Sequence, residues 1–202
     1  MKYSSIIFDL DGTLIDSFPG IYEALSDACR LVDGTVFTED SLQVGPPVVG
    51  MLKQVASHYS DDMVKKAVSL FRDSYDSELW KRYNVYPGAQ DILEGLVDSK
   101  RFLFLATNKP QAPTLKILND LGWMNIFSSI SCFDKNIHKD KTHLVSTIEL
   151  TGAKSLLVGD TEGDEVAATQ NGIDFCFCDY GYGENQNYPL VINSITELLE
   201  KI

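Results

Sequence analysis

Residues 6–13 of the chain read IIFDLDGT, an apolar run that ends in two aspartates and a glycine. Residues 6–8 indicate a short buried strand, and Gly12 allows the backbone to turn sharply after it. Because residues two apart on a strand share a face, Asp9 and Asp11 can project together from the strand end. Most Asp-x-Asp pairs are solvated turn acids, but the apolar run before this pair favours a functional one.

The pattern beyond this strand changes to helical periodicity. Apolar residues recur at spacings of three and four, which is typical of amphipathic helices. They are Ile21, Leu25, Ala28 and Leu31, then Met51, Leu52 and Val55, then Val64, Val68, Phe71 and Tyr75. We therefore expect an all-helical insert over residues 16–84, broken at Gly45-Pro46-Pro47.

Strands and helices alternate in the rest of the chain. Apolar runs predict strands at 102–106, 130–132, 156–158 and 175–177, with a helix that ends near 98 and others from 110, 140 and 162. Such alternation is typical of parallel strands joined by crossover helices. We expect an α/β protein with a doubly wound, Rossmann-like, mostly parallel sheet in residues 1–15 and 85–202, and an inserted helical cap domain at 16–84. In such sheets ligands bind at the carboxyl ends of strands, where the strand order reverses.

The composition limits the possible functions. The chain has 202 residues, of which 44% are hydrophobic, enough for one core with a small insertion. Its net charge of −12 argues against a nucleic acid polymer as partner, because binding to the phosphate backbone depends on Lys and Arg. The four cysteines show no paired CxxC spacing, and no apolar run is long enough for a leader or a membrane span. We expect reduced thiols, no membrane partner and a cytoplasmic protein.

A second pair of acids follows the strand predicted at 156–158. Asp160 comes directly after its end, and Asp164 falls in the first turn of the next helix. Either one alone could merely cap that helix. Together with Asp9 and Asp11, however, they place four carboxylates at one edge of the sheet, where like charges repel. A divalent cation resolves this repulsion, and ligands that are all oxygen favour a hard ion such as Mg²⁺.

Polar and basic residues are predicted at the same edge. Thr107 follows a buried strand, and its hydroxyl and the nearby backbone N–H groups could hold a phosphate oxygen, although Thr107 or Asn108 could equally cap a helix. A lysine, either Lys139 or Lys141, precedes or begins the helix near residue 140. If Asp140 is the N-cap, Lys141 lies on the buried stripe of that helix and Lys139 is a solvated loop charge.

These residues resemble, in chain order, the four motifs of haloacid dehalogenase superfamily hydrolases. The first is carried by residues 8–14 and the second by Thr107-Asn108; the third is Lys141, and the fourth is Gly159-Asp160 with Asp164. Segments 16–17, 44–47, 86–88 and 181–183 resemble the phosphoglycolate phosphatase-like branch of this superfamily, which carries a helical cap. The usual Lys-Pro of the third motif is absent, which leaves the choice between Lys139 and Lys141 open.

The resemblance implies a Mg²⁺-dependent phosphatase that hydrolyses a small phosphorylated metabolite, with phosphoglycolate as the first expectation. It implies that Asp9 is the nucleophile, which forms an aspartyl-phosphate, and that Asp11 is the general acid and base. The implied phosphate-binding groups are Gly12, Thr107, Asn108 and Lys141. The implied metal ligands are Asp9, the Asp11 carbonyl and Asp160, with Asp164 in support. The protein is expected to be a monomer or a homodimer.

Three other functions are alternatives to this one. A dehalogenase of the same fold lacks a second acid at the position of Asp11. A phosphomutase would need cap residues for a second phosphate, and none can be identified in 16–84. A non-catalytic phosphate-binding regulatory protein is the third alternative, but every motif residue needed for chemistry is present.

Overall fold

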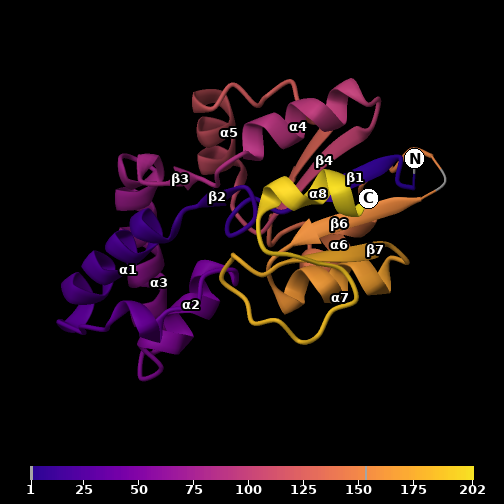
Figure 1. Cartoon of the computed structure of the whole chain (residues 1–202). Coiled ribbons are helices and arrows are strands. Elements are labelled where there is room, and N and C mark those ends of the chain that lie inside the picture. Colours follow the sequence, from indigo (N-terminus) through magenta and orange to yellow (C-terminus); the bar gives the residue numbers. More distant parts are fainter. Residues whose placement is uncertain (1, 153) are drawn as a thin grey trace. The chain divides into compact units, whose positions relative to one another are not determined.

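The computed structural model describes residues 2–152 and 154–202, and the chain divides into two compact units. One unit holds Met1–Asp16 and Val85–Ile202, and the other holds Ser17–Asn84. The first is an α/β unit and the second is helical (Figure 1). None of the helices in the described residues is long and apolar enough to cross a membrane.

A six-stranded sheet forms the centre of the α/β unit. Its strands, in spatial order, are β5 (Ser129–Cys132), β4 (Phe102–Thr107), β1 (Ser5–Phe8), β6 (Ser155–Gly159), β7 (Asp174–Cys178) and β8 (Val191–Ile192). Each neighbouring pair is parallel. The chain runs from β1 outward through β4 to β5, then returns through β6 to β7 and β8 on the other side of β1. The predicted doubly wound parallel sheet is therefore confirmed, and its strand order reverses at β1.

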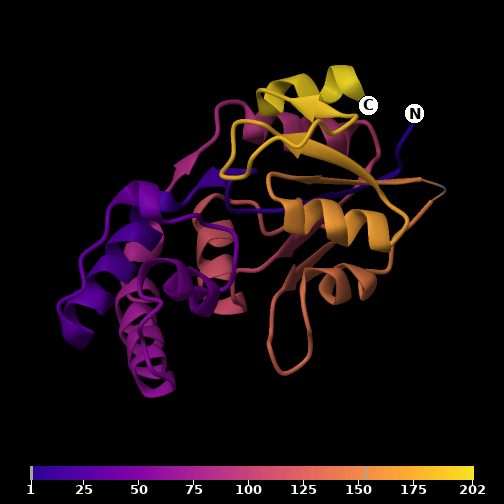
Figure 2. The same ribbon diagram turned by 90° about the horizontal axis from the view of Figure 1, so that it is seen from below.

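Helices cover both faces of this sheet. They are α4 (Ala89–Asp98), α5 (Gln111–Asp120), α6 (Lys141–Ser146), α7 (Glu162–Gln170), the short 3₁₀ helix η3 (Ile195–Glu197) and α8 (Leu198–Lys201). Figure 1 labels these helices, and the turned view in Figure 2 shows α4 and α8 on one side of the strands and α6 and α7 together on the other. This is the arrangement that crossover connections on both sides of a central strand produce.

The core beneath α6 and α7 follows the strand register. Ile7 is aligned with Phe104 of β4 and with Leu157 of β6, so the three side chains emerge on the same face of the sheet. Leu144 and Ile148, from α6 and the turn after it, are buried against them. The short helix α6 is therefore held mainly by packing rather than by its own propensity.

The second unit is built from three helices. They are α1 (Phe18–Asp33), α2 (Val48–Val55) and α3 (Asp61–Tyr75), with 3₁₀ turns η1 (Glu39–Ser41) and η2 (Leu79–Lys81). Helix α1 packs on α3, where Leu25 and Phe71 are buried. Leu31 was expected on the same apolar stripe, but it is 64% exposed. Six residues advance a helix by about 240° beyond Leu25, so the spacing places Leu31 off the packed face.

Two short strands join the units. β2 (Ile15–Asp16) pairs with β3 (Asn84–Val85), and the Tyr86 N–H donates to the Leu14 carbonyl at 3.1 Å. The sequence pattern did not predict these strands or β8, because two-residue strands have no detectable periodicity.

The core predicts a clear stability difference between two truncations. Leu157→Ala should lower the free energy of unfolding by about 2–5 kcal/mol, because it leaves a cavity under α6 and α7. Ile137→Ala, at a position that is 63% exposed, should change it by less than about 0.5 kcal/mol. Urea unfolding followed by circular dichroism measures both. Equal effects would contradict the assignment of Leu157 to the core.

Candidate active site

Asp9 and Asp11 lie just beyond the end of β1. The Asp9 N–H donates to the Val158 carbonyl at 3.0 Å, which extends the pairing of β1 with β6 by one residue. Both side chains are buried. Gly12 then adopts a φ of 88°, and its N–H donates to the Ile15 carbonyl at 2.8 Å. The Gly12 N–H is thus engaged in the turn, and the contact of Gly12 with phosphate stays a prediction.

Asp160 is fully buried after β6 and held from two directions. The Thr13 hydroxyl donates to its Oδ1 at 3.2 Å, and the Tyr182 N–H donates to its Oδ2 at 2.7 Å. A Cβ on Gly12 would lie 2.1 Å from Asp160 Oδ2, so only glycine allows the turn to approach so closely. Burial raises the pKa of Asp160 well above its usual value, because it disfavours the charged form.

Asp164 has two roles in this structure. Its Oδ2 accepts from the Thr161 N–H at 3.0 Å and from the Thr161 hydroxyl at 2.6 Å, which closes a capping box at the start of α7. Its Oδ1 contacts the ammonium of Lys141. The helix-cap interpretation of Asp164 is correct, and it is compatible with a place in the carboxylate cluster.

Lys141 is the first residue of α6, and its side chain is buried. Asp140 is the N-cap and accepts from the His143 N–H at 2.8 Å, as the sequence predicted. The Lys141 Nζ lies 2.6 Å from Asp9 Oδ1 and also contacts Asp164. Lys139 is exposed. The geometry therefore favours Lys141 as the lysine at the strand ends.

Thr107 is the last residue of β4, and Asn108 follows it at the same edge of the sheet. Thr107 is buried, and its Oγ1 accepts from the Lys109 N–H at 3.1 Å, which leaves the hydroxyl proton to be donated elsewhere. Asn108 is half-buried. Lys109 is not among the predicted site residues, and its Nζ lies 3.0 Å from Asp11 Oδ1. Thr13 and Tyr182 were not predicted to have a role either, because their contacts with Asp160 join distant parts of the chain.

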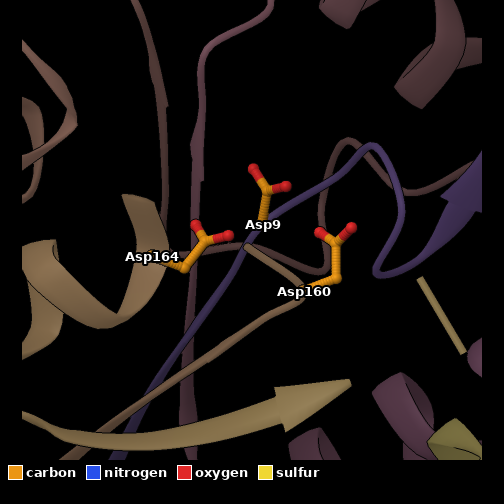
Figure 3. A group of neighbouring side chains, drawn as sticks. All are labelled: Asp9, Asp160 and Asp164. Atoms are coloured by element: carbon orange, nitrogen blue, oxygen red, sulfur yellow. The ribbon is translucent and has the colours of Figure 1, made fainter. Parts of the chain in front are cut away.

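Three of the carboxylates form a potential cation site. One oxygen from each of Asp9, Asp160 and Asp164 lies within 4.8 Å of the others, and Figure 3 shows the three groups close together. Among the described residues, the Asp11 carboxylate is not part of this group. Burial raises the pKa of Asp9 to about 7; Lys141 opposes this shift and Asp164 adds to it. The all-oxygen donor set fits a hard divalent cation.

The charge balance supports the same conclusion. Among the described residues, the buried charged side chains are Asp9, Asp11, Asp160, Asp164, Lys109 and Lys141. When all are ionised, two negative charges remain without a buried partner. A divalent cation would neutralise them, and removing charge from a buried cluster lowers its electrostatic free energy.

Comparisons with known proteins agree with this geometry. The profile of the haloacid dehalogenase-like hydrolase family matches residues 6–178, and the chain belongs to this family. It is 30% identical over 193 residues to a phosphoglycolate phosphatase of Mesorhizobium japonicum, covering 90% of this chain and 85% of the relative.

Two further similarities extend over most of the chain. A 5'-nucleotidase of Pseudomonas aeruginosa is 27% identical over 190 residues, which cover 91% of this chain and 86% of the relative. The crystal structure of a predicted phosphatase from Clostridium acetobutylicum superposes with a TM-score of 0.89 at 25% identity, covering 100% of this chain and 98% of that one.

The acidic cluster predicts that cation binding depends on pH. The raised pKa of Asp9 means that the metal-free folded state holds a proton more tightly than the unfolded state does. This contribution to stability is therefore lost as pH rises from about 4 to about 7. A cation must displace that proton, so Mg²⁺ should raise the melting temperature more at about pH 8 than at about pH 5.5.

Melting curves with and without Mg²⁺ measure this difference. Asp160→Asn, which removes one ligand charge, should abolish the Mg²⁺ effect. Asp62→Asn changes a side chain that is 92% exposed and should keep the effect. An equal Mg²⁺ shift in Asp160→Asn would contradict the assigned site.

Proposed function

We propose that the chain is a Mg²⁺-dependent phosphatase that hydrolyses a small phosphate monoester through an aspartyl-phosphate on Asp9. One observation carries this proposal: Asp9 is buried with Lys141 Nζ 2.6 Å from its Oδ1, beside Asp160 and Asp164. The Lys141 ammonium and a bound cation would offset the repulsion between the Asp9 carboxylate and a dianionic phosphate, which favours nucleophilic attack.

The first step transfers the phosphoryl group to the protein. An Asp9 carboxylate oxygen forms a bond to phosphorus while the bond between phosphorus and the ester oxygen breaks. Asp11, two residues further along the same turn, gives its proton to the departing oxygen, so that an alcohol leaves. Protonation matters because an alkoxide is a poor leaving group.

The second step returns Asp9 to its starting state. Asp11, now a carboxylate, takes a proton from a water molecule as the water oxygen bonds to phosphorus. The bond between phosphorus and Asp9 breaks, inorganic phosphate leaves, and both side chains regain their original protonation. The two steps share one pair of groups in reversed roles.

Stabilisation of the transition state comes from charges and donors around the phosphoryl oxygens. Lys141 supplies a fixed positive charge, and the Thr107 hydroxyl supplies a hydrogen-bond donor. When held by Asp9, Asp160 and the Asp11 carbonyl, with Asp164 in support, Mg²⁺ would neutralise phosphate charge and orient the ester. The Lys141 charge is in place before the reaction begins, so the site needs no rearrangement to stabilise the transition state.

The proposed substrate class is a small phosphate monoester, with phosphoglycolate first. Support comes from the similarity to a phosphoglycolate phosphatase, while the similarity to a 5'-nucleotidase makes nucleoside monophosphates the next class to compare. We further propose that residues 17–84 act as a cap that selects the substrate and excludes water during the reaction.

Replacement of the nucleophile should abolish turnover without unfolding the protein. Asp9→Asn is nearly isosteric but removes the attacking carboxylate, so phosphate release should fall at least about a thousandfold. The assay uses phosphoglycolate, with nucleoside monophosphates and sugar phosphates for comparison. Intact mass after acid quench should show one added phosphoryl group in the wild type and none in the variant.

Asp62→Asn, at the exposed position already used, is the matched control and should retain wild-type turnover. Activity of Asp9→Asn within about tenfold of the wild type would contradict the nucleophile assignment. So would an added phosphoryl group that remains on the variant.

The two lysines near the start of α6 should differ strongly. Lys141→Ala should lower turnover at least about a hundredfold, because it removes a preorganised positive charge from the transition state. Lys139→Ala, at an exposed position two residues earlier, should change turnover by less than about twofold. Steady-state kinetics measure both, with melting curves to check folding. The reverse ranking would assign the active-site lysine to Lys139.

A further inference from the structure

A second buried lysine lies at the same edge of the sheet. The side chain of Lys109 is 4% exposed, and its Nζ lies 3.0 Å from Asp11 Oδ1. A buried ammonium is strongly unfavourable unless a negative group compensates it. The ion pair of Lys109 and Asp11 is therefore a fixed part of the buried site and not a mobile surface contact.

The local sequence places Lys109 at this point. Its N–H donates to the Thr107 hydroxyl at 3.1 Å, which ties its backbone to the end of β4. Pro110 follows as the N-cap of α5 with a φ of −62°. A residue before proline is disfavoured in the helical conformation, so Lys109 stays in the connection between strand and helix. Since β4 and β1 are neighbours, that connection lies beside Asp11.

Asp9 and Asp11 are thus each paired with a different lysine. Lys141 contacts Asp9 and Asp164, whereas Lys109 contacts Asp11. Among the described residues, the cation site consists of Asp9, Asp160 and Asp164, and the Asp11 carboxylate is not part of it. A divalent cation bound at this site would attract the Asp11 carboxylate, and the positive charge of Lys109 opposes a movement of that carboxylate toward the cation.

We propose that Lys109 is a positioning residue that holds the Asp11 carboxylate apart from the cation site and directed at the ester oxygen. This inference rests on the proposed function, in which Asp11 protonates that oxygen. A side chain displaced by about 1 Å can lower a rate on the order of a hundredfold. Lys109 would thereby control proton transfer without touching the transferred group.

Leaving groups of different basicity provide the test. Lys109→Met should slow phosphorylation of Asp9 by an alkyl phosphate on the order of a hundredfold. An aryl phosphate such as p-nitrophenyl phosphate needs little protonation of its leaving oxygen, so its phosphorylation rate should fall by less than about fivefold. Rapid-quench single-turnover measurements with intact mass detection give both rates. KM should change little, because no substrate contact is removed.

Matched variants separate positioning from other roles. Lys109→Arg, which keeps the charge, should restore part of the alkyl phosphate rate, and Lys109→Gln serves if the Met variant does not fold. Lys135→Met, at an exposed position, should leave both rates unchanged. In an Asp11→Asn background, Lys109→Met should have an effect of less than about twofold, because the group that it positions is already lost.

Several outcomes would overturn the inference. Equal losses with alkyl and aryl phosphates would indicate a direct role at the phosphoryl group, and a raised KM with unchanged turnover would indicate a substrate contact. If the rate losses caused by Lys109→Met and by Asp11→Asn multiplied in full in the double variant, Lys109 would not act through Asp11. If the wild type formed no phosphorylated Asp9, the proposed function would fail together with this inference. The other outcomes overturn only the role of Lys109.

Discussion

Four aspartates are buried together at one edge of a parallel sheet, and their mutual repulsion must be offset by positive charge. Two of them follow β1 directly, and two follow β6, because parallel neighbours end at the same edge. Water cannot screen these charges effectively once they are buried. When all four are ionised, the two buried lysines compensate half of the negative charge, and the remainder makes this edge suitable for a divalent cation.

Short-range features of the chain place both lysines. Asp140 caps α6 and so makes Lys141 its first residue, while Pro110 is the N-cap of α5 and keeps Lys109 outside the helix. A shift of one residue in the start of α6 would turn the Lys141 ammonium away from its carboxylates, because each residue rotates the helix by about 100°. The electrostatics of the site therefore depend on where α6 begins and on where the chain enters α5.

Asp160 is held at the same edge of the sheet by the turn after β1 and by the loop after β7. Thr13 and the backbone of Tyr182 occupy its two oxygens, and Gly12 permits the first turn to pass close to it. The Tyr182 hydroxyl also donates to Asp16 at 2.8 Å, where β2 leaves the α/β unit. One loop after β7 thus connects the carboxylate cluster with the strand that leads toward the helical unit.

The sequence by itself determined the parallel α/β architecture, the acids at the ends of β1 and β6, and the capped start of α6. These features depend on periodicity and on contacts within a few residues, which a linear pattern records. Only the tertiary structure decided that Lys109 pairs with Asp11 and that the Tyr182 N–H donates to Asp160. Both contacts depend on which distant segments of the chain become neighbours, and a linear pattern does not specify this.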